Sequence, residues 1–214
     1  MKKGGRYDVS ELIEAQFEPG SRGRVLRNRL GINRIREMNR VETVALQSAT
    51  DGFFRRFDEE HCFRADDIRD MHRIWLGEIY QWAGEYRSVN VSKGDFMFAV
   101  AARIPALMLE FQRSVLARRT PCRSPDRQDV ATALAEVHVE LLLIHPFREG
   151  NGRIARALAT LMAAQAGLPQ LDFSLLAGRR RNEYFAAVQA GMDRNYRPMA
   201  AIFAQLIEKS LGAS

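Results

Sequence analysis

The chain contains few cysteines and histidines and has no long apolar run. Two cysteines occur in 214 residues, Cys62 and Cys122, without the Cys-x-x-Cys spacing, which argues against a disulfide framework and a cysteine metal site. His61, His72 and His138 show no spacing that converges on zinc, so we expect structural roles for them. No apolar stretch approaches the length of a membrane span, and the N-terminal residues contain no signal-peptide core. We therefore expect no membrane partner and a cytoplasmic protein, unless a secretion system exports it.

The remaining composition is typical of a globular enzyme domain. A length of 214 residues, with 46% apolar and 27% charged residues, suffices for one substantial core. The net charge of +6 could indicate nucleic-acid binding, but arginine is spread along the chain. The tightest cluster, 179–181, is short and has no interleaved aromatics. A nucleic-acid partner is therefore not expected.

Apolar periodicity predicts a mainly α fold. Apolar residues at steps of three and four, with helix-stopping residues between the runs, mark several helices. Within one of them Ile68, Trp75 and Trp82 recur at steps of seven, so both tryptophans are expected in the core. The expected helices are 33–57, 65–84, 103–118, 126–145, a run from Arg153 to Gly167, 182–192 and 199–211.

The most informative segment lies between two of these helices. It reads Ile-His-Pro-Phe-Arg-Glu-Gly-Asn-Gly-Arg-Ile-Ala-Arg over residues 144–156. Pro146 ends the first helix at His145, because a proline and the residue before it disfavour helical backbone. The glycines at 150 and 152 then lead directly into the next helix, whose first N–H groups are free and carry a positive dipole end. An anion-binding loop is expected here.

The charged residues of this segment suit a phosphate substrate. Arg153 and Arg156 lie three apart, so both guanidinium groups can reach one side of the helix and bind a polyphosphate. Glu149 is a suitable carboxylate ligand for Mg²⁺, which binds one or two carboxylates together with substrate phosphates. His145 is the side chain best suited to accept a proton from a hydroxyl near neutral pH.

Residues 145–156 resemble the signature of Fic (Fic/Doc) domain proteins, His-Pro-Phe-x-(Asp/Glu)-Gly-Asn-Gly-Arg-x-x-Arg, at every specified position. The resemblance implies a single Fic-type helical bundle and a protein adenylyltransferase that moves AMP from ATP to a Ser, Thr or Tyr hydroxyl of a target and releases pyrophosphate. By position, it implies His145 as general base, Phe147 as apolar anchor of the loop, Glu149 as ligand of Mg²⁺, Gly150, Asn151 and Gly152 as the cradle of the α- and β-phosphates, and Arg153 and Arg156 as ligands of the β- and γ-phosphates.

A β-hairpin is predicted between residues 86 and 99. Apolar and polar residues alternate there around Lys93-Gly94-Asp95, which is a turn signal. In Fic proteins a hairpin called the flap covers the active site and binds the target segment by strand addition. The resemblance therefore implies a target-docking flap formed by Val91, Ser92, Lys93, Gly94, Asp95 and Phe96.

Outside the motif, the resemblance covers residues 17 to about 205. We expect an N-terminal extension over 1–32 and a Fic domain over 33–214. Tyr184 matches an aromatic position near the nucleotide base in related proteins, and contact with adenine and packing between the last helices are equally open for it.

Regulation has two candidate forms. Ser10 and Glu14 have the four-residue step of the inhibitory Ser/Thr-x-x-x-Glu helix of many Fic proteins. The N-terminal Pro-Gly and Leu-Gly-Ile elements are more similar to those of relatives restrained by a separate small antitoxin, so we favour control in trans.

Two alternative functions stay open: another Fic chemistry, such as transfer from a different nucleotide or removal of AMP, and a catalytically idle adaptor that binds a nucleotide or a partner.

Overall fold

The central helix, α5 (Arg127–Ile144), forms where the apolar periodicity predicts it. Asp126 begins it, since its carboxylate accepts a hydrogen bond of 2.8 Å from the Gln128 amide. His145 ends it in the left-handed conformation, with φ 52° and ψ 59°, immediately before Pro146. The expected helix over 126–145 is confirmed, and its end places the imidazole at the entrance to the motif loop.

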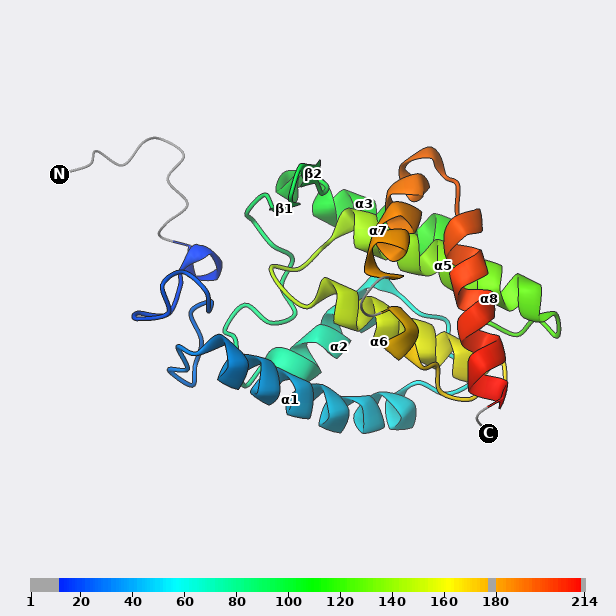
Figure 1. Ribbon diagram of the computed structural model, residues 1–214, viewed down its shortest axis with the longest axis horizontal. Coiled ribbons are helices and arrows are strands. Elements are labelled where there is room, and N and C mark those ends of the chain that lie inside the picture. The colour runs from blue at the N-terminus through cyan, green and yellow to red at the C-terminus, as the bar shows by residue number, and fades with distance from the viewer. Residues whose placement is uncertain (1–11, 177–179, 213–214) are drawn as a thin grey trace.

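Figure 1 shows the arrangement around α5 in the computed structural model, which describes residues 12–176 and 180–212. Helices α6, α8, α3 and α7 pack against α5, while α1 packs on α2. The helices are α1 (Ile35–Arg56), α2 (Ala65–Leu76), α3 (Ile104–Phe111), α4 (Ala117–Arg119), α5, α6 (Asn151–Gln165), α7 (Arg180–Ala190) and α8 (Arg197–Gly212). Shorter helical segments are η1 (Ile13–Ala15), η2 (Ala101–Arg103), the π-helical η3 (Gln112–Leu116), η4 (Phe173–Leu176) and η5 (Gly191–Asp193). The predicted mainly α fold is confirmed.

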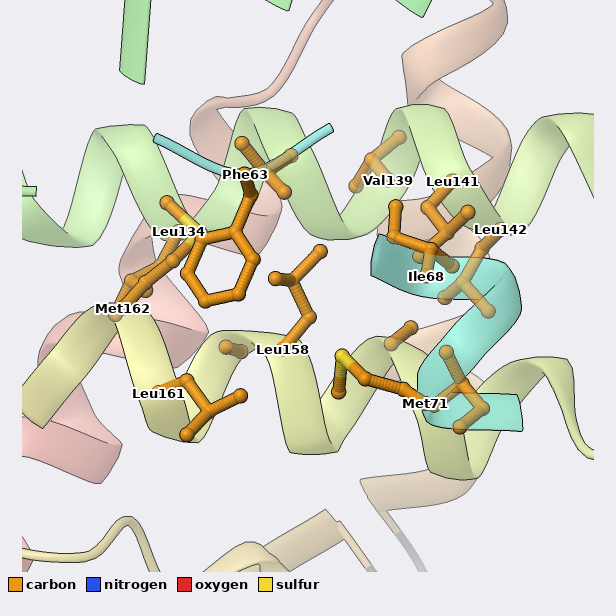
Figure 2. Packing of buried hydrophobic residues seen from close by; sticks show 14 of the residues in the cluster. Phe63, Ile68, Met71, Leu134, Val139, Leu141, Leu142, Leu158, Leu161 and Met162 are labelled. Carbon is orange, nitrogen blue, oxygen red and sulfur yellow. The ribbon is translucent and has the colours of Figure 1, made fainter. Parts of the chain in front are cut away.

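The core lies between α2, α5 and α6. Figure 2 shows Phe63, just before α2, among Leu134 of α5 and Leu158 and Met162 of α6. All four side chains are at most 2% exposed. The apolar faces of the two helices that flank the motif loop are therefore held together by packing, which fixes the two ends of the loop.

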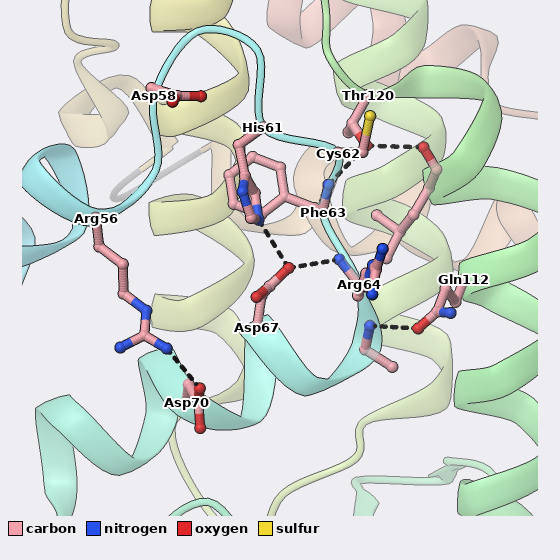
Figure 3. Close-up of polar contacts among 12 residues, drawn as sticks. Arg56, Asp58, His61, Cys62, Phe63, Arg64, Asp67, Asp70, Gln112 and Thr120 are labelled. Atoms are coloured by element: carbon pink, nitrogen blue, oxygen red, sulfur yellow. Dashed lines mark hydrogen bonds and ion pairs between the residues drawn. The ribbon is translucent and has the colours of Figure 1, made fainter.

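Polar contacts fix the start of α2 (Figure 3). The Asp67 carboxylate accepts a 2.8 Å hydrogen bond from the Arg64 amide and lies 2.8 Å from His61 Nε2. Gln112 of η3 accepts a 2.9 Å hydrogen bond from the Ala65 amide. These bonds satisfy N–H groups that a helix leaves free at its first turn. They also join α2 to the α3–α4 run.

The expected helix over 65–84 is too long. The structure ends α2 at Leu76, and the chain continues in turns. Gly77 disfavours continuation, and the turns let Tyr80 stack on Trp82 at 4.5 Å and donate a 2.6 Å hydrogen bond to the Glu42 carboxylate. Trp75 lies in α2 and Trp82 in the turns that follow it, so both are buried, but their spacing of seven does not mark a single helix.

The predicted hairpin is confirmed. Strand β1 (Ser92–Lys93) pairs antiparallel with β2 (Phe96–Met97), and Lys93 lies opposite Phe96. The turn contains Gly94, whose φ of +58° favours glycine. In Figure 1 the hairpin and α7 both lie in the upper half of the view.

The segment between η1 and α1 packs onto this framework through the buried side chains of Val25 and Leu26. Leu26 forms an isolated antiparallel bridge with Phe17. The boundary expected between residues 32 and 33 stays a prediction. Among the described residues, no helix is both long enough and apolar enough to cross a membrane.

Candidate active site

A cavity of about 560 Å³ lies between the motif loop, the hairpin and α7. Most of the predicted site residues line it, whereas Phe147, Arg153, Gly94 and Asp95 do not. The residues that line it are Val91, Ser92, Lys93, Phe96, Phe98, Leu142, His145, Arg148, Glu149, Gly150, Asn151, Gly152, Arg156, Tyr184, Phe185, Val188 and Gln189.

His145 presents a proton acceptor to this cavity. Its Nδ1 lies 3.2 Å from the Leu142 carbonyl. Because a carbonyl only accepts, Nδ1 carries the proton of the neutral ring and Nε2 keeps its lone pair. The ring stacks on Phe98 at 3.7 Å. Burial, reinforced by the positive charges of Arg87 and Lys93, lowers the pKa of His145 to about 4. The imidazole is therefore neutral near pH 7, as a general base must be.

Phe147 and Asn151 close the motif loop. The Phe147 amide donates to Asn151 Oδ1 at 2.9 Å, and Asn151 Nδ2 donates to the Phe147 carbonyl at 2.8 Å. The Phe147 ring is fully buried and stacks on His72 at 3.9 Å. Asn151 thus shapes the loop with both of its side-chain polar atoms, although we had expected it in the phosphate cradle.

Gly150 begins α6 with a φ of +86°. A Cβ at this position would lie 2.7 Å from the Trp75 ring, so only glycine fits. Gly152 also lines the cavity, so the first turn of α6 directs its N–H groups and dipole toward this space. The predicted anion-binding loop has the geometry of a helix N-terminus.

Glu149 is the acid of the motif that faces the cavity. Its side chain is 48% exposed, and it accepts a 3.0 Å hydrogen bond from the Gly150 amide. The described residues contain no cluster of three or more His, Cys, Asp or Glu that could hold a metal alone. A single carboxylate beside a phosphate-binding helix end nevertheless fits Mg²⁺, which binds few protein oxygens when a nucleotide supplies the others.

The second motif arginine, Arg156, lies in the cavity wall, where burial lowers the pKa of its guanidinium. It donates to the Tyr184 hydroxyl. That hydroxyl also lies 2.7 Å from His138 Nε2, within hydrogen-bond distance. Tyr184 thus lines the cavity while its polar end anchors Arg156.

The first motif arginine, Arg153, points elsewhere. Its guanidinium lies 2.7 Å from the buried Glu42 carboxylate of α1 and 4.6 Å from the centre of the Trp75 ring. It also lies 3.5 Å from Glu149. Arg156 therefore lines the cavity, whereas Arg153 contacts the cavity acid Glu149 from outside it, and the phosphate-binding role of both arginines stays a prediction.

Sequence analysis missed His72 as a support of the loop. The Gly84 amide donates to His72 Nδ1 at 2.8 Å, so the remaining ring proton is on Nε2, 3.1 Å from the Glu149 carbonyl. Burial lowers the pKa of His72 to about 4 and keeps this arrangement neutral. From its spacing we expected His72 to be structural rather than a metal ligand, and nothing in that spacing connects it with residue 149.

The flap reaches across the cavity. The Lys93 ammonium lies 3.7 Å from the centre of the Phe185 ring of α7, a cation–π distance. Val91, Ser92, Lys93 and Phe96 line the cavity. The predicted flap and motif loop are therefore brought together, although their contact through Phe185 had not been anticipated.

Glu14 lies at the base of the flap. It is buried, and its carboxylate accepts hydrogen bonds from the amide and the hydroxyl of Ser88. Its carbonyl accepts a 2.9 Å hydrogen bond from Arg148, another cavity residue that had not been predicted. Ser10, the other residue of the candidate inhibitory helix, lies outside the described residues. Within residues 12–176 and 180–212, no ion pair joins Glu14 to Arg156.

Comparisons with known proteins find related sequences. Residues 62–163 match the sequence profile of the Fic/DOC family. The probable protein adenylyltransferase y4lH of Sinorhizobium fredii is 28% identical over 202 residues, which cover 94% of this chain and 99% of that protein. The protein adenylyltransferase VbhT of Bartonella schoenbuchensis is 30% identical over 148 residues, which cover 67% of this chain but 30% of VbhT.

A solved structure gives the same result for the fold. The N-terminal Fic domain of a VirB-translocated effector protein of Bartonella quintana, determined with bound ADP, is 25% identical with a TM-score of 0.67. The alignment covers 85% of this chain and 89% of that domain.

Proposed function

The chain belongs to the Fic/DOC family, and from this premise we propose that it is a protein adenylyltransferase that transfers AMP from ATP to a Ser, Thr or Tyr hydroxyl of a target protein. The observation that carries the proposal is one cavity that holds both a neutral imidazole with a free Nε2 and an arginine-flanked helix N-terminus. The first suits a proton acceptor and the second suits phosphate.

His145 acts on the incoming nucleophile. Its Nε2 accepts the proton of the target hydroxyl while that oxygen forms a bond to the α-phosphorus of ATP. The bond between this phosphorus and the bridging oxygen to the β-phosphate breaks, and pyrophosphate leaves with the electron pair. Because the protein contributes little covalent chemistry, orientation and charge stabilisation carry most of the rate enhancement.

The phosphates are bound by the first turn of α6. The N–H groups around Gly150 and Gly152 donate to them, and Arg156 neutralises the terminal part of the triphosphate. Glu149 would hold Mg²⁺, which would offset phosphate charge when bound. Arg153 serves this site through its contact with Glu149.

The flap supplies the target site. Extended backbone at Val91, Ser92 and Phe96 borders the cavity, so a target segment that adds a strand there would bring its hydroxyl toward His145. A cytoplasmic location and a separate antitoxin that restrains the enzyme complete the proposal.

The test is transfer of label from ATP. The purified chain is incubated with Mg²⁺ and either α-labelled or γ-labelled ATP, alone and with a cell lysate. We expect a protein band labelled from the α position only, and no band with His145→Ala, which should still bind ATP. Label from the γ position, or equal labelling by the His145 variant, would contradict the proposal.

A further inference from the structure

The Arg87 side chain donates hydrogen bonds to both arms of the flap and to the backbone of the catalytic histidine. It is 2% exposed and follows the turns after α2. All of its partners are backbone carbonyls in three separate segments. Nε donates to His145 O at 2.7 Å, Nη1 to Val89 O at 2.7 Å, and Nη2 to Ala99 O at 2.6 Å and to Ile144 O at 3.4 Å.

The chemistry of this contact is unusual for a buried charge. Burial lowers the pKa of Arg87, and the negative charge of Glu14 partly offsets this effect. Glu14, however, bonds to Ser88 with its carboxylate, so the guanidinium is satisfied by neutral acceptors alone. A buried cation without an ion-pair partner is expensive to maintain. An apolar residue with a repacked loop would give a more stable fold than this buried cation.

The geometry shows what the cation does. Val89 and Ala99 lie on the two arms that lead into and out of the hairpin, whereas His145 belongs to the motif loop. A guanidinium is planar and rigid, so its donors fix these acceptors relative to one another. His145 also has a left-handed backbone, which a non-glycine residue adopts only when its surroundings hold it.

We propose that Arg87 is a positioning residue that couples the flap to the general base. It keeps a target bound on the flap at a fixed distance and orientation from the His145 ring. The inference rests on the proposed transferase function for its kinetic consequence. The mechanical coupling stands independently of that function.

The first experiment measures the coupling directly. Amide hydrogen exchange is compared between the wild-type chain, Arg87→Lys and the matched control Arg119→Lys, which changes a partly buried arginine bonded to Glu136. A lysine keeps the charge, but its three donors lie on one nitrogen and lack the rigid planar spread of the guanidinium, so it cannot reproduce this arrangement of acceptors. Exchange in peptides 88–99 and 144–148 should rise together, on the order of tenfold, while α8 and the control stay unchanged.

The second experiment measures catalysis. With α-labelled ATP and the most strongly labelled lysate protein as acceptor, Arg87→Lys should lower kcat on the order of 100-fold, because small misplacements of a reacting group have effects of this size. The KM and Kd for ATP should stay unchanged, since Arg87 touches none of the phosphate-binding residues. Methylguanidinium, but not methylammonium, should partly restore Arg87→Ala.

The outcomes separate the two claims. A rise of exchange in only one of the two segments, or an equal rise throughout the chain, overturns the coupling. An unchanged kcat, or a loss of ATP binding in proportion to kcat, overturns the role of Arg87 in positioning the general base. A wild-type chain that transfers no label overturns the proposed function, and coupled exchange would still support the role of Arg87 in holding the two segments.

Discussion

The pH dependence of transfer tests the state of the general base. An unperturbed histidine titrates near pH 6.5, whereas burial lowers the pKa of His145 to about 4. The Leu142 carbonyl opposes this shift, and Arg87 and Lys93 reinforce it. Since the base must be neutral, activity should be present above the pKa and disappear as the pH falls through it.

The magnitude follows from the two pKa values. At pH 5, a group with a pKa of about 4 is about 90% neutral, whereas one that titrates at 6.5 is about 3% neutral. The reasoning therefore predicts about 30-fold more activity at pH 5 than an ordinary histidine base would allow. The difference lies well outside the error of a rate measurement.

The assay is kcat/KM for α-labelled ATP between pH 4.5 and 8 in excess Mg²⁺, because this ratio reports groups of the free enzyme. Circular dichroism at each pH identifies any loss caused by unfolding. The variant Lys93→Gln removes a positive charge near the ring and should raise the midpoint, whereas the matched variant Lys209→Gln, whose lysine pairs with Asp172, should not. A wild-type acid limb centred at 6.5, with the protein folded, would refute the reasoning.

Three further substitutions test the loop and its supports. Phe147→Ala removes a fully buried ring and should lower the free energy of unfolding by about 3–5 kcal/mol in urea denaturation, and a loss below ~1 kcal/mol would contradict its anchoring role. Arg156→Ala should weaken ATP binding by roughly 10–100-fold in calorimetry, and unchanged affinity would exclude it as a phosphate ligand. Glu42→Gln removes the nearer carboxylate partner of Arg153 and should cost about 2 kcal/mol of stability. The double variant with Arg153→Met should lose less than the sum of the two single changes, and simple additivity would mean that the pair does not interact.

The parts of this fold that were predictable are those that depend on neighbouring residues. Pro146 lies two residues after Ile144, the last residue of α5, and Gly150 begins α6, so the bend at the motif could be located without a structure. The hairpin around Gly94 was predictable for the same reason. The end of α2 was not, because the tertiary bond from Tyr80 to Glu42 outweighs the local apolar spacing.

The roles within the motif were less predictable than the motif itself. Spacing placed Arg153 and Arg156 on the same side of a helix, which is correct for an isolated helix. In the folded chain a carboxylate 111 residues away attracts one of them and leaves the other in the cavity. Asn151 likewise turns inward to the loop backbone. Local geometry limits where a side chain can reach, but distant partners decide where it goes.

A sequence can nevertheless indicate that such a distant partner exists. Glu42 occupies the stripe of α1 that also buries Met38, Ala49 and Phe53, so a carboxylate interrupts an otherwise apolar face. A charge at such a position must be satisfied within the protein, because burial without a partner costs several kcal/mol, on the order of 3–5. In this chain its partner is a motif arginine, which in turn contacts the acid at the cavity. A charged residue on the buried stripe of a helix is therefore a reasonable first place to search for groups that support an active site, even when its partner lies far away in the chain.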